Sequence, residues 1–304
     1  MMKGQVSSSE LRPREWIRFL CVRRSSAQIV TEILRLCCNL KGFSWNHYYT
    51  DIKPPDWEAA QDEMIRHIPT NLRFLNWNGA IQFNTLAEFL RKTSASLQIL
   101  CACRIQVNKL PQQPLLRASY PSLTHVHLEG TSLFVWLEAV NWEMPSLIEL
   151  NLFELYVGQG FPKVFRTVGK TLRVLRLGRY VRLMPELLSH ILDAYANLEE
   201  LYYHTGYGGV DDTPRWAFDV THMKMQKVGI DASMAKSMDF SEASPMLRDR
   251  FGPISKTRFP LLDTLIIYDI SIGSLVLTNH TFVMRRVAED FYSAEISWMT
   301  AYFK

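Results

Sequence analysis

The sequence has no long apolar run and no surplus of charge of either sign. No stretch approaches the ~20 consecutive apolar residues of a membrane-spanning helix, and residues 1–10 have no apolar segment typical of a signal peptide. Lysine and arginine total 34 against 30 acidic residues, a net charge of +4. The densest basic group, in residues 12–24, alternates with apolar residues and is typical of a solvated helix face. We therefore expect neither a membrane nor a nucleic acid as partner.

Cysteine is scarce as well. There are five cysteines, an odd number, and four of them are adjacent or nearly so: Cys37 with Cys38, and Cys101 with Cys103. This spacing is poorly suited to a disulfide framework and favours a reducing compartment. We expect the protein to be cytoplasmic or nuclear.

Sequence motifs of catalysis are also missing. The chain has no Gly-x-Ser-x-Gly and no His-Glu-x-x-His, and Gly206–Gly209 lacks the Lys-Ser/Thr that completes a phosphate-binding loop. We therefore expect a protein that is not an enzyme, with no catalytic residue and no cofactor.

What the sequence does contain is an internal repeat. Residues 121–128, 145–152, 170–177 and 196–203 each read apolar-x-x-apolar-x-apolar after a small polar residue. The same frame extends in both directions, and six of the eight steps between successive lead residues are 24 to 27 residues long, within the range of leucine-rich repeats. The lead residues are Leu40, Leu72, Leu97, Leu123, Leu147, Leu172, Leu198, Met225 and Leu262.

Each repeat predicts a short strand followed by a return segment. Side chains alternate along a strand, so the fourth and sixth residues of a repeat point into the core and the third, fifth and seventh point outward. A helix is the usual way to return the chain to the next parallel strand. The sequence predicts helices over Gln28–Leu36 and after Asn84, Thr131 or Ser132, Pro162 and Pro185.

These Ser/Asn-Leu-x-x-Leu-x-Leu units resemble the leucine-rich repeats of ribonuclease-inhibitor-like proteins. Their irregularity, the tryptophans in the strands and the segment Arg258–Leu265 look most like fungal F-box and leucine-rich-repeat proteins. The resemblance implies an α/β fold: a right-handed, horseshoe-shaped leucine-rich-repeat solenoid with a parallel concave sheet, helical returns and about nine irregular repeats. It divides the chain into an N-terminal tail and helical cap (1–39), the solenoid (40–275) and a C-terminal cap helix and tail (276–304).

The resemblance implies a protein-protein interaction module without catalytic activity. Such a module is similar to the substrate-recognition part of an F-box-type ubiquitin-ligase receptor, with a possible link to a cullin-type ligase. Only Pro13–Ile17 echoes the start of an F-box, so either the module is lost or the sequence is a fragment. The alternative is a standalone scaffold or inhibitor that binds a partner protein on its concave sheet.

The outward strand positions of the best-supported repeats predict the partner-binding face. Arg176 and Tyr202 are the expected anchors, because arginine and tyrosine often dominate interface energies. The competing interpretation is a solvated face, with binding on loops or on the convex side. The candidate residues are His125, His127, Glu149, Asn151, Phe153, Arg176, Glu200, Tyr202 and His204.

Two short patterns within this face could bind metal. His125 and His127 are two residues apart on one strand, but zinc needs a third and usually a fourth ligand, and Glu149 and His204 are the only nearby candidates. An exposed binding face is the favoured interpretation of the histidines. Free thiols are the favoured interpretation of the Cys-x-Cys pair at 101 and 103. We expect no metal site.

Overall fold

The computed structural model describes most of the repeat region. The described residues are 16–47, 56–106, 118–130, 142–153, 170–178, 185–204, 221–231, 254–268 and 283–287.

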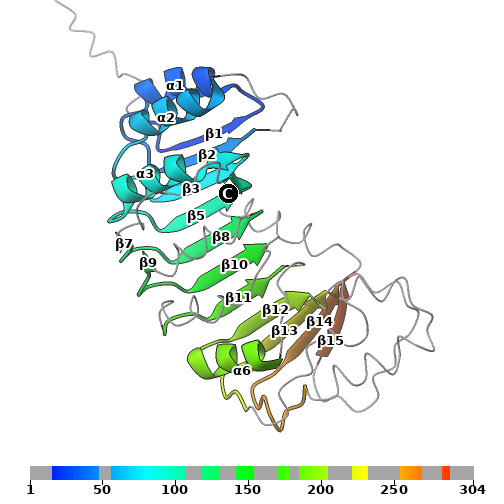
Figure 1. Ribbon diagram of the computed structural model, residues 1–304. Helices are drawn as coiled ribbons and strands as arrows, with labels where there is room; N and C mark the ends of the chain where they lie inside the picture. The colour runs from blue at the N-terminus through cyan, green and yellow to red at the C-terminus, as the bar shows by residue number, and fades with distance from the viewer. Residues whose placement is uncertain are drawn as a thin grey trace, which may run out of the picture.

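One parallel sheet dominates these residues. Its eleven strands within the described ranges pair in chain order, and every neighbouring pair is parallel (Figure 1). All nine strands that the repeat predicts are present, so the predicted parallel sheet is confirmed. The strands are β1 (Phe19–Arg23), β2 (Gly42–Asn46), β3 (Phe74–Asn78), β5 (Ile99–Cys103), β8 (His125–Glu129), β10 (Glu149–Phe153), β11 (Val174–Leu177), β12 (Glu200–His204), β13 (Lys227–Asp231), β14 (Thr264–Tyr268) and β15 (Val283–Val287).

Two small parallel pairs lie beside the main sheet. Strand β4 (Ile81–Gln82) pairs with β6 (Ile105–Gln106), and β7 (Ala118–Ser119) pairs with β9 (Trp142–Glu143). Each pair joins equivalent points of two successive repeats, and thus continues the stacking of the main sheet into the return segments.

The core lies on one face of the sheet, as the repeat predicts. Trp45 and Trp77 fill it at the N-terminal end, with ring centroids 4.8 Å apart in an edge-on arrangement. Burying a leucine-sized side chain stabilises a fold by about 1.5–3 kcal/mol, so the leucines at the fourth and sixth positions of the repeats are a major source of stability. The nine core positions predicted from the three central repeats are all buried, with 0–2% of each residue exposed: Leu123, Val126, Leu128, Leu147, Leu150, Leu152, Leu172, Leu175 and Leu177.

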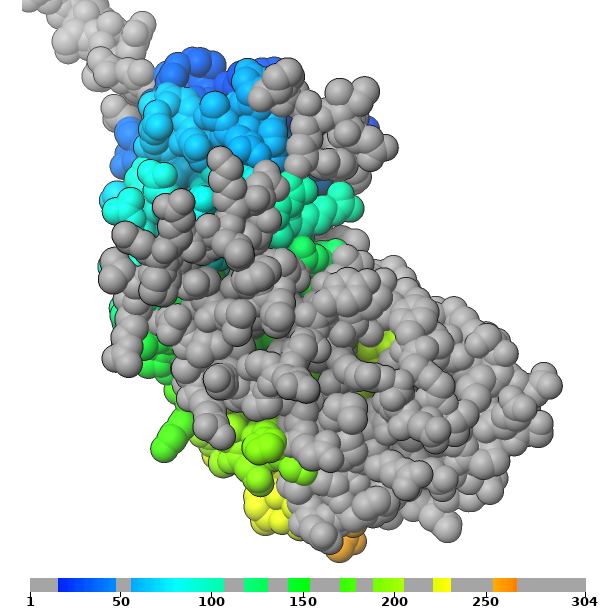
Figure 2. All heavy atoms as spheres, viewed as in Figure 1, coloured from blue at the N-terminus to red at the C-terminus, as the bar shows by residue number. Residues whose placement is uncertain are grey.

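Helices connect several of the strands. The described residues contain α1 (Ala27–Leu36), α2 (Trp57–His67), α3 (Phe83–Thr93) and α6 (Pro185–Ala194). Helix α1 begins after Ser26, whose hydroxyl accepts a hydrogen bond from the Ile29 amide at 3.4 Å. In Figure 2 the residues of α1, α2 and α3 (blue to cyan) gather toward one end of the molecule, and those of α6 (yellow-green) lie toward the other.

Three of the predicted helices are confirmed. They are α1, α3 and α6, although α3 begins one residue before Asn84, with Gln82 as its N-cap. The helices predicted after Thr131 or Ser132 and after Pro162 lie outside the described residues. Helix α2 was not predicted: its segment falls within the longer first step of 32 residues.

The predicted helical caps need two corrections. Residues 19–23, expected in the N-terminal cap, form β1, because Ile17, Leu20 and Val22 have the same spacing as the repeat and pack toward the core. Residues 283–287, expected in a C-terminal cap helix, form β15 against β14. The sheet therefore extends by one strand beyond each end of the predicted array.

In five repeats the small polar residue before the lead leucine links that repeat to the one before it. The Ser96 hydroxyl donates to the carbonyl of Leu72 at 2.8 Å, and the Thr171 hydroxyl donates to that of Leu147 at 2.9 Å. Ser146 and Asn197 donate in the same way to carbonyls 25 and 27 residues earlier. These side chains satisfy turn carbonyls that the strands do not reach, which explains why the position recurs as Ser, Thr or Asn.

Three strands are each followed directly by a residue with left-handed backbone geometry. Arg24, Arg104 and Gly130 directly follow β1, β5 and β8 and have φ angles of 56°, 55° and 60°. The amide of Arg104 donates to the carbonyl of Glu129 at 2.7 Å, which extends the pairing of the two strands by one bond. At Arg104 this geometry is strained, because the Cβ of a non-glycine residue is crowded there.

No helix in the described part of the chain is long and apolar enough to cross a membrane.

Candidate partner-binding face and a buried Cys-His-Glu cluster

The residues predicted to bind a partner share one face of the main sheet. We call it the polar face and define it by the described side chains at the first, third and fifth residues of strands β1 to β14 of the main sheet, which point away from the leucine core. Parallel pairing in register places Glu149 beside His125, Asn151 beside His127, and Arg176 between Asn151 and Tyr202. Because the strands stack without offset, positions 24 to 27 residues apart in sequence become neighbours.

A chain of polar contacts crosses the polar face. Glu149 lies at its centre: its Oε1 accepts a hydrogen bond from the Asn151 side-chain Nδ2 at 3.0 Å and lies 3.5 Å from the Arg176 Nε. Its Oε2 lies 3.9 Å from the His125 Nε2. Burial lowers the pKa of His125, although the neighbouring Glu149 acts to raise it. The imidazole is therefore mainly neutral at neutral pH.

The contacts continue onto β12 and β13. The Arg176 guanidinium carbon lies 4.1 Å from the centroid of the Tyr202 ring, within cation–π range. The Tyr202 hydroxyl donates to the Glu200 Oε2 at 2.8 Å, and Lys227 Nζ contacts the Glu200 Oε1 at 2.7 Å. Sequence reasoning omitted Lys227, which holds the outward third position of the repeat led by Met225 and could have been included on that ground.

The polar face is less exposed than predicted. His127, Asn151, Phe153, Tyr202 and His204 are each at most 4% exposed, so the expectation that His127 lies on an exposed, wet face is wrong. One cause is that planar side chains lie over their neighbours. The Phe153 ring stacks on His127 with centroids 5.2 Å apart, and Arg176 covers Tyr202.

The charged side chains keep some exposure. The side chains of Glu149, Arg176 and Glu200 are 16%, 20% and 22% exposed, and that of Lys227 is 39% exposed. His125, which is mainly neutral, lies next to Glu149 at the end of the same row and is 19% exposed. We call these five residues the charged row. They are the part of the polar face that an approaching molecule would meet.

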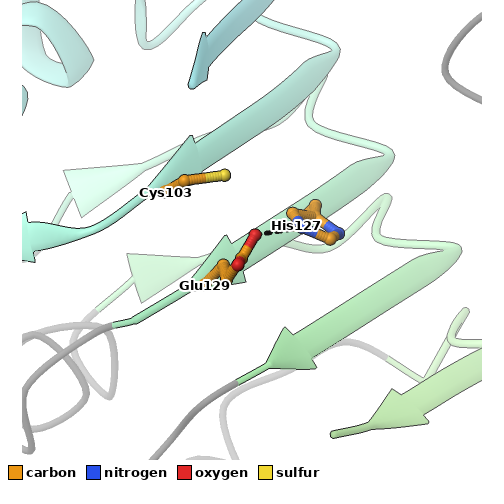
Figure 3. Close-up of side chains that lie close together, drawn as sticks. All are labelled: Cys103, His127 and Glu129. Carbon is orange, nitrogen blue, oxygen red and sulfur yellow. Dashed lines mark ion pairs between the residues drawn. The ribbon is translucent and has the colours of Figure 1, made fainter. Parts of the chain in front are cut away.

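A different cluster occupies the polar face at β5 and β8. Cys103 is the cross-strand neighbour of Glu129, and His127 lies two residues before Glu129 on the same strand. The thiol sulfur, one imidazole nitrogen and one carboxylate oxygen all lie within 4.8 Å of one another. Figure 3 shows the three side chains on the same side of the two strands, with the contact between His127 and Glu129 drawn as a dashed line.

The surroundings of the cluster shift the pKa of two of its groups, Glu129 and Cys103. The nearby His127 ring, whose Nε2 lies 4.0 Å from Oε2, lowers the pKa of Glu129. Burial raises the pKa of the Cys103 thiol well above its usual value. Neither ring nitrogen of His127 has a hydrogen-bond partner within the described part of the protein, although the residue is only 3% exposed.

This grouping differs from the one that the sequence suggested. His125 and His127 point to the same face, but Cys103 and Glu129 are the side chains that converge on His127, whereas Glu149 and His204 were the candidates considered. The register of β5 and β8, which pairs Cys103 with Glu129, is the signal that would have identified the cluster.

Together the strand order, the leucine core and the polar face define an α/β protein with the parallel sheet of a leucine-rich-repeat-like solenoid. No protein-family model matches the chain, and no curated protein matches it.

The solved structures that are similar in part include the two that follow. The complex of Rad7 and Elc1 from yeast matches with 11% identity and a TM-score of 0.37, covering 89% of this chain and 79% of the other. The leucine-rich repeat-containing protein LegL7 from Legionella pneumophila matches with 12% identity and a TM-score of 0.40, covering 80% and 70%. At these values neither similarity supports a conclusion about function.

Proposed function

We propose that the chain is a non-catalytic protein-interaction module that binds a partner protein through the charged row of its polar face. In this proposal the polar face is the concave side of a right-handed horseshoe. The observation that carries it is the pre-organised set of partly exposed charges on four successive strands, from Glu149 on β10 to Lys227 on β13.

Pre-organisation supports binding because it lowers the cost of association. Ordering a long side chain at an interface costs about 0.5–1.5 kcal/mol. Arg176 is already held between Glu149 and the Tyr202 ring, and Glu200 is held by Tyr202 and Lys227. The signs alternate along the row, so the expected partner surface also alternates in charge, which favours selectivity over general electrostatic attraction.

The test compares partner capture by the wild-type chain and three variants. Lys227→Glu reverses the most exposed charge of the row, and Glu149→Gln removes its central charge with little change in shape. Arg66→Glu on α2, where the side chain is 66% exposed, is the matched control away from the row. Proteins captured from the source cells are quantified by mass spectrometry, and the affinity of the strongest partner is then measured for each variant.

We expect both row variants to bind that partner at least 10-fold more weakly, about 1.4 kcal/mol, while the control binds normally. Melting curves check that all three variants are folded. Equal affinity for all of them would place binding on loops or on the other side of the molecule.

We further propose that the module is the substrate-recognition part of an F-box-type ubiquitin-ligase receptor in the cytoplasm or nucleus. This step is supported by the sequence resemblance alone. Recovery of cullin-type ligase subunits with the wild-type chain would support it. Capture of a partner without such subunits would favour the alternative, a standalone scaffold or inhibitor that covers its partner with the same face.

A further inference from the structure

The Cys103, His127 and Glu129 side chains combine three kinds of metal-binding atom at one point of the polar face. They come from adjacent strands and lie within 4.8 Å of one another (Figure 3). We propose that these three residues bind a zinc ion. The site is separate from the charged row, and the proposal does not depend on partner binding.

The donor set selects the metal. Magnesium and calcium are bound by oxygen, whereas a sulfur, a nitrogen and an oxygen together suit zinc. Three protein ligands leave a fourth position for water, an arrangement found in zinc sites that remain open to small molecules. Binding replaces the thiol proton of Cys103, which passes to solvent.

The geometry is close to what zinc needs. Bond lengths of about 2.0–2.3 Å in a tetrahedron place ligand atoms roughly 3.3–3.8 Å apart. The ligand atoms lie within 4.8 Å of one another, so the widest separation must shrink by at most roughly 1–1.5 Å. Glu129 can supply much of this movement by rotation, because 30% of its side chain is exposed and its backbone is held by strand pairing.

The buried histidine is an independent sign of a missing ligand. His127 is 3% exposed, and neither of its ring nitrogens has a hydrogen-bond partner among the described residues. The nearest carboxylate oxygen, 4.0 Å from Nε2, is beyond hydrogen-bond distance. Leaving a buried polar atom without a partner costs about 1–3 kcal/mol, and coordination of one nitrogen to zinc would remove that cost.

A cavity lies near the ends of the two strands that carry the cluster. Its volume is about 280 Å³, and it is lined by Ala80, Arg104, Gln106 and Gly130. Two of its lining residues, Arg104 and Gly130, directly follow Cys103 and Glu129 in the chain.

The experiment uses Co²⁺ as a spectroscopic substitute for zinc, with an untagged chain and its thiols kept reduced. A cobalt–thiolate bond gives a charge-transfer absorption that oxygen and nitrogen ligands do not give. We expect one Co²⁺ per chain with this absorption, and its displacement by one equivalent of Zn²⁺. Zinc should also raise the melting temperature, because a ligand that binds only the folded state stabilises it.

Four variants locate the site. Cys103→Ser should remove the thiolate absorption. His127→Phe, which keeps the stacking on Phe153, should weaken zinc binding at least ~10-fold, as should Glu129→Gln. Cys101→Ser is the matched control: Cys101 is buried on the same face beside His127, and its loss should leave the absorption intact.

Three outcomes would overturn the proposal. The first is that the wild-type chain binds no stoichiometric metal. The second is that Cys103→Ser and Glu129→Gln both bind zinc as tightly as the wild type. The third is that the absorption is lost in Cys101→Ser but not in Cys103→Ser. Circular dichroism confirms folding of each variant. Glu129→Gln decides the matter if a buried substitution unfolds the chain, because Glu129 is partly exposed and its replacement needs no repacking.

Discussion

The ring of Tyr202 on β12 lies against Gly229 on β13, so closely that a β carbon at position 229 would be 2.6 Å from the Tyr202 Cε1. Tyr202 cannot easily move away, because its hydroxyl is bonded to Glu200 and Arg176 stacks on its ring. The absence of a side chain at Gly229 thus determines the position of an aromatic residue on the polar face.

Gly229→Ala should therefore lower the free energy of unfolding by about 1–3 kcal/mol, as overpacked substitutions do. In a Tyr202→Ala background the same change should cost less, because the clashing ring is gone. Urea unfolding of the two single variants and the double variant measures this coupling, which we expect to exceed ~0.5 kcal/mol. Additive effects would show that Tyr202 does not constrain position 229.

Leu150 and Ile148 provide a test of the core. Leu150 is 1% exposed and points into the leucine core, whereas Ile148, two residues earlier, is 36% exposed. Leu150→Ala should cost ~2–5 kcal/mol, and Ile148→Ala should stay within about 0.5 kcal/mol of the wild type. Thermal melts of both variants measure the difference. Equal melting temperatures would contradict the inward orientation of Leu150.

The strained turn after β5 predicts a substitution that stabilises the protein. Arg104 has a φ angle of 55°, which costs a non-glycine residue ~1–2 kcal/mol, while glycine loses about 0.5–1 kcal/mol in unfolded-state entropy. Arg104→Gly should therefore raise the free energy of unfolding by roughly 0.5–1 kcal/mol. Urea unfolding measures the change.

The opposite substitution one repeat later is the control for that turn. Gly130 has a φ angle of 60°, and a β carbon there would lie 3.3 Å from the Arg104 Cα, so Gly130→Ala should destabilise by ~1–2 kcal/mol. Changes of the same sign in Arg104→Gly and Gly130→Ala would mean that backbone strain does not govern these turns.

The cysteines should fall into two reactivity classes. Cys21 and Cys38 are exposed, whereas Cys37, Cys101 and Cys103 are buried, and burial also raises the pKa of Cys37 and Cys103. Because the thiolate is the reactive form, a brief treatment of the folded protein with an alkylating reagent should label only the first two. Peptide mass spectrometry identifies the modified residues. Rapid labelling of Cys103 would contradict its buried position at β5.

The strands could be predicted because their signal is local. An apolar residue at the fourth and sixth positions of a repeat reports the alternation of a strand with one buried face, and the spacing of lead residues such as Leu123 and Leu147 reports the stacking. The pattern was also present at Ile17, Leu20 and Val22, where β1 forms. It is absent around β15. The residues that pair with Leu265 and Ile267, the fourth and sixth positions of the preceding repeat, are Met284 and Arg286, and arginine breaks the apolar pattern. Only the pairing with β14 identifies this strand.

The sequence predicted which residues lie on the polar face, but not how exposed they are or which of them contact one another. The sequence by itself determined which residues point away from the core, because side-chain alternation and a near-constant repeat length place His125, Glu149 and Arg176 on one face whatever the details of packing. Only the tertiary structure decided which of them remain exposed, and that Cys103 meets His127 and Glu129. Those outcomes depend on strand register and on the rotamers that crowded neighbours allow, and neither is encoded in the spacing of a single strand.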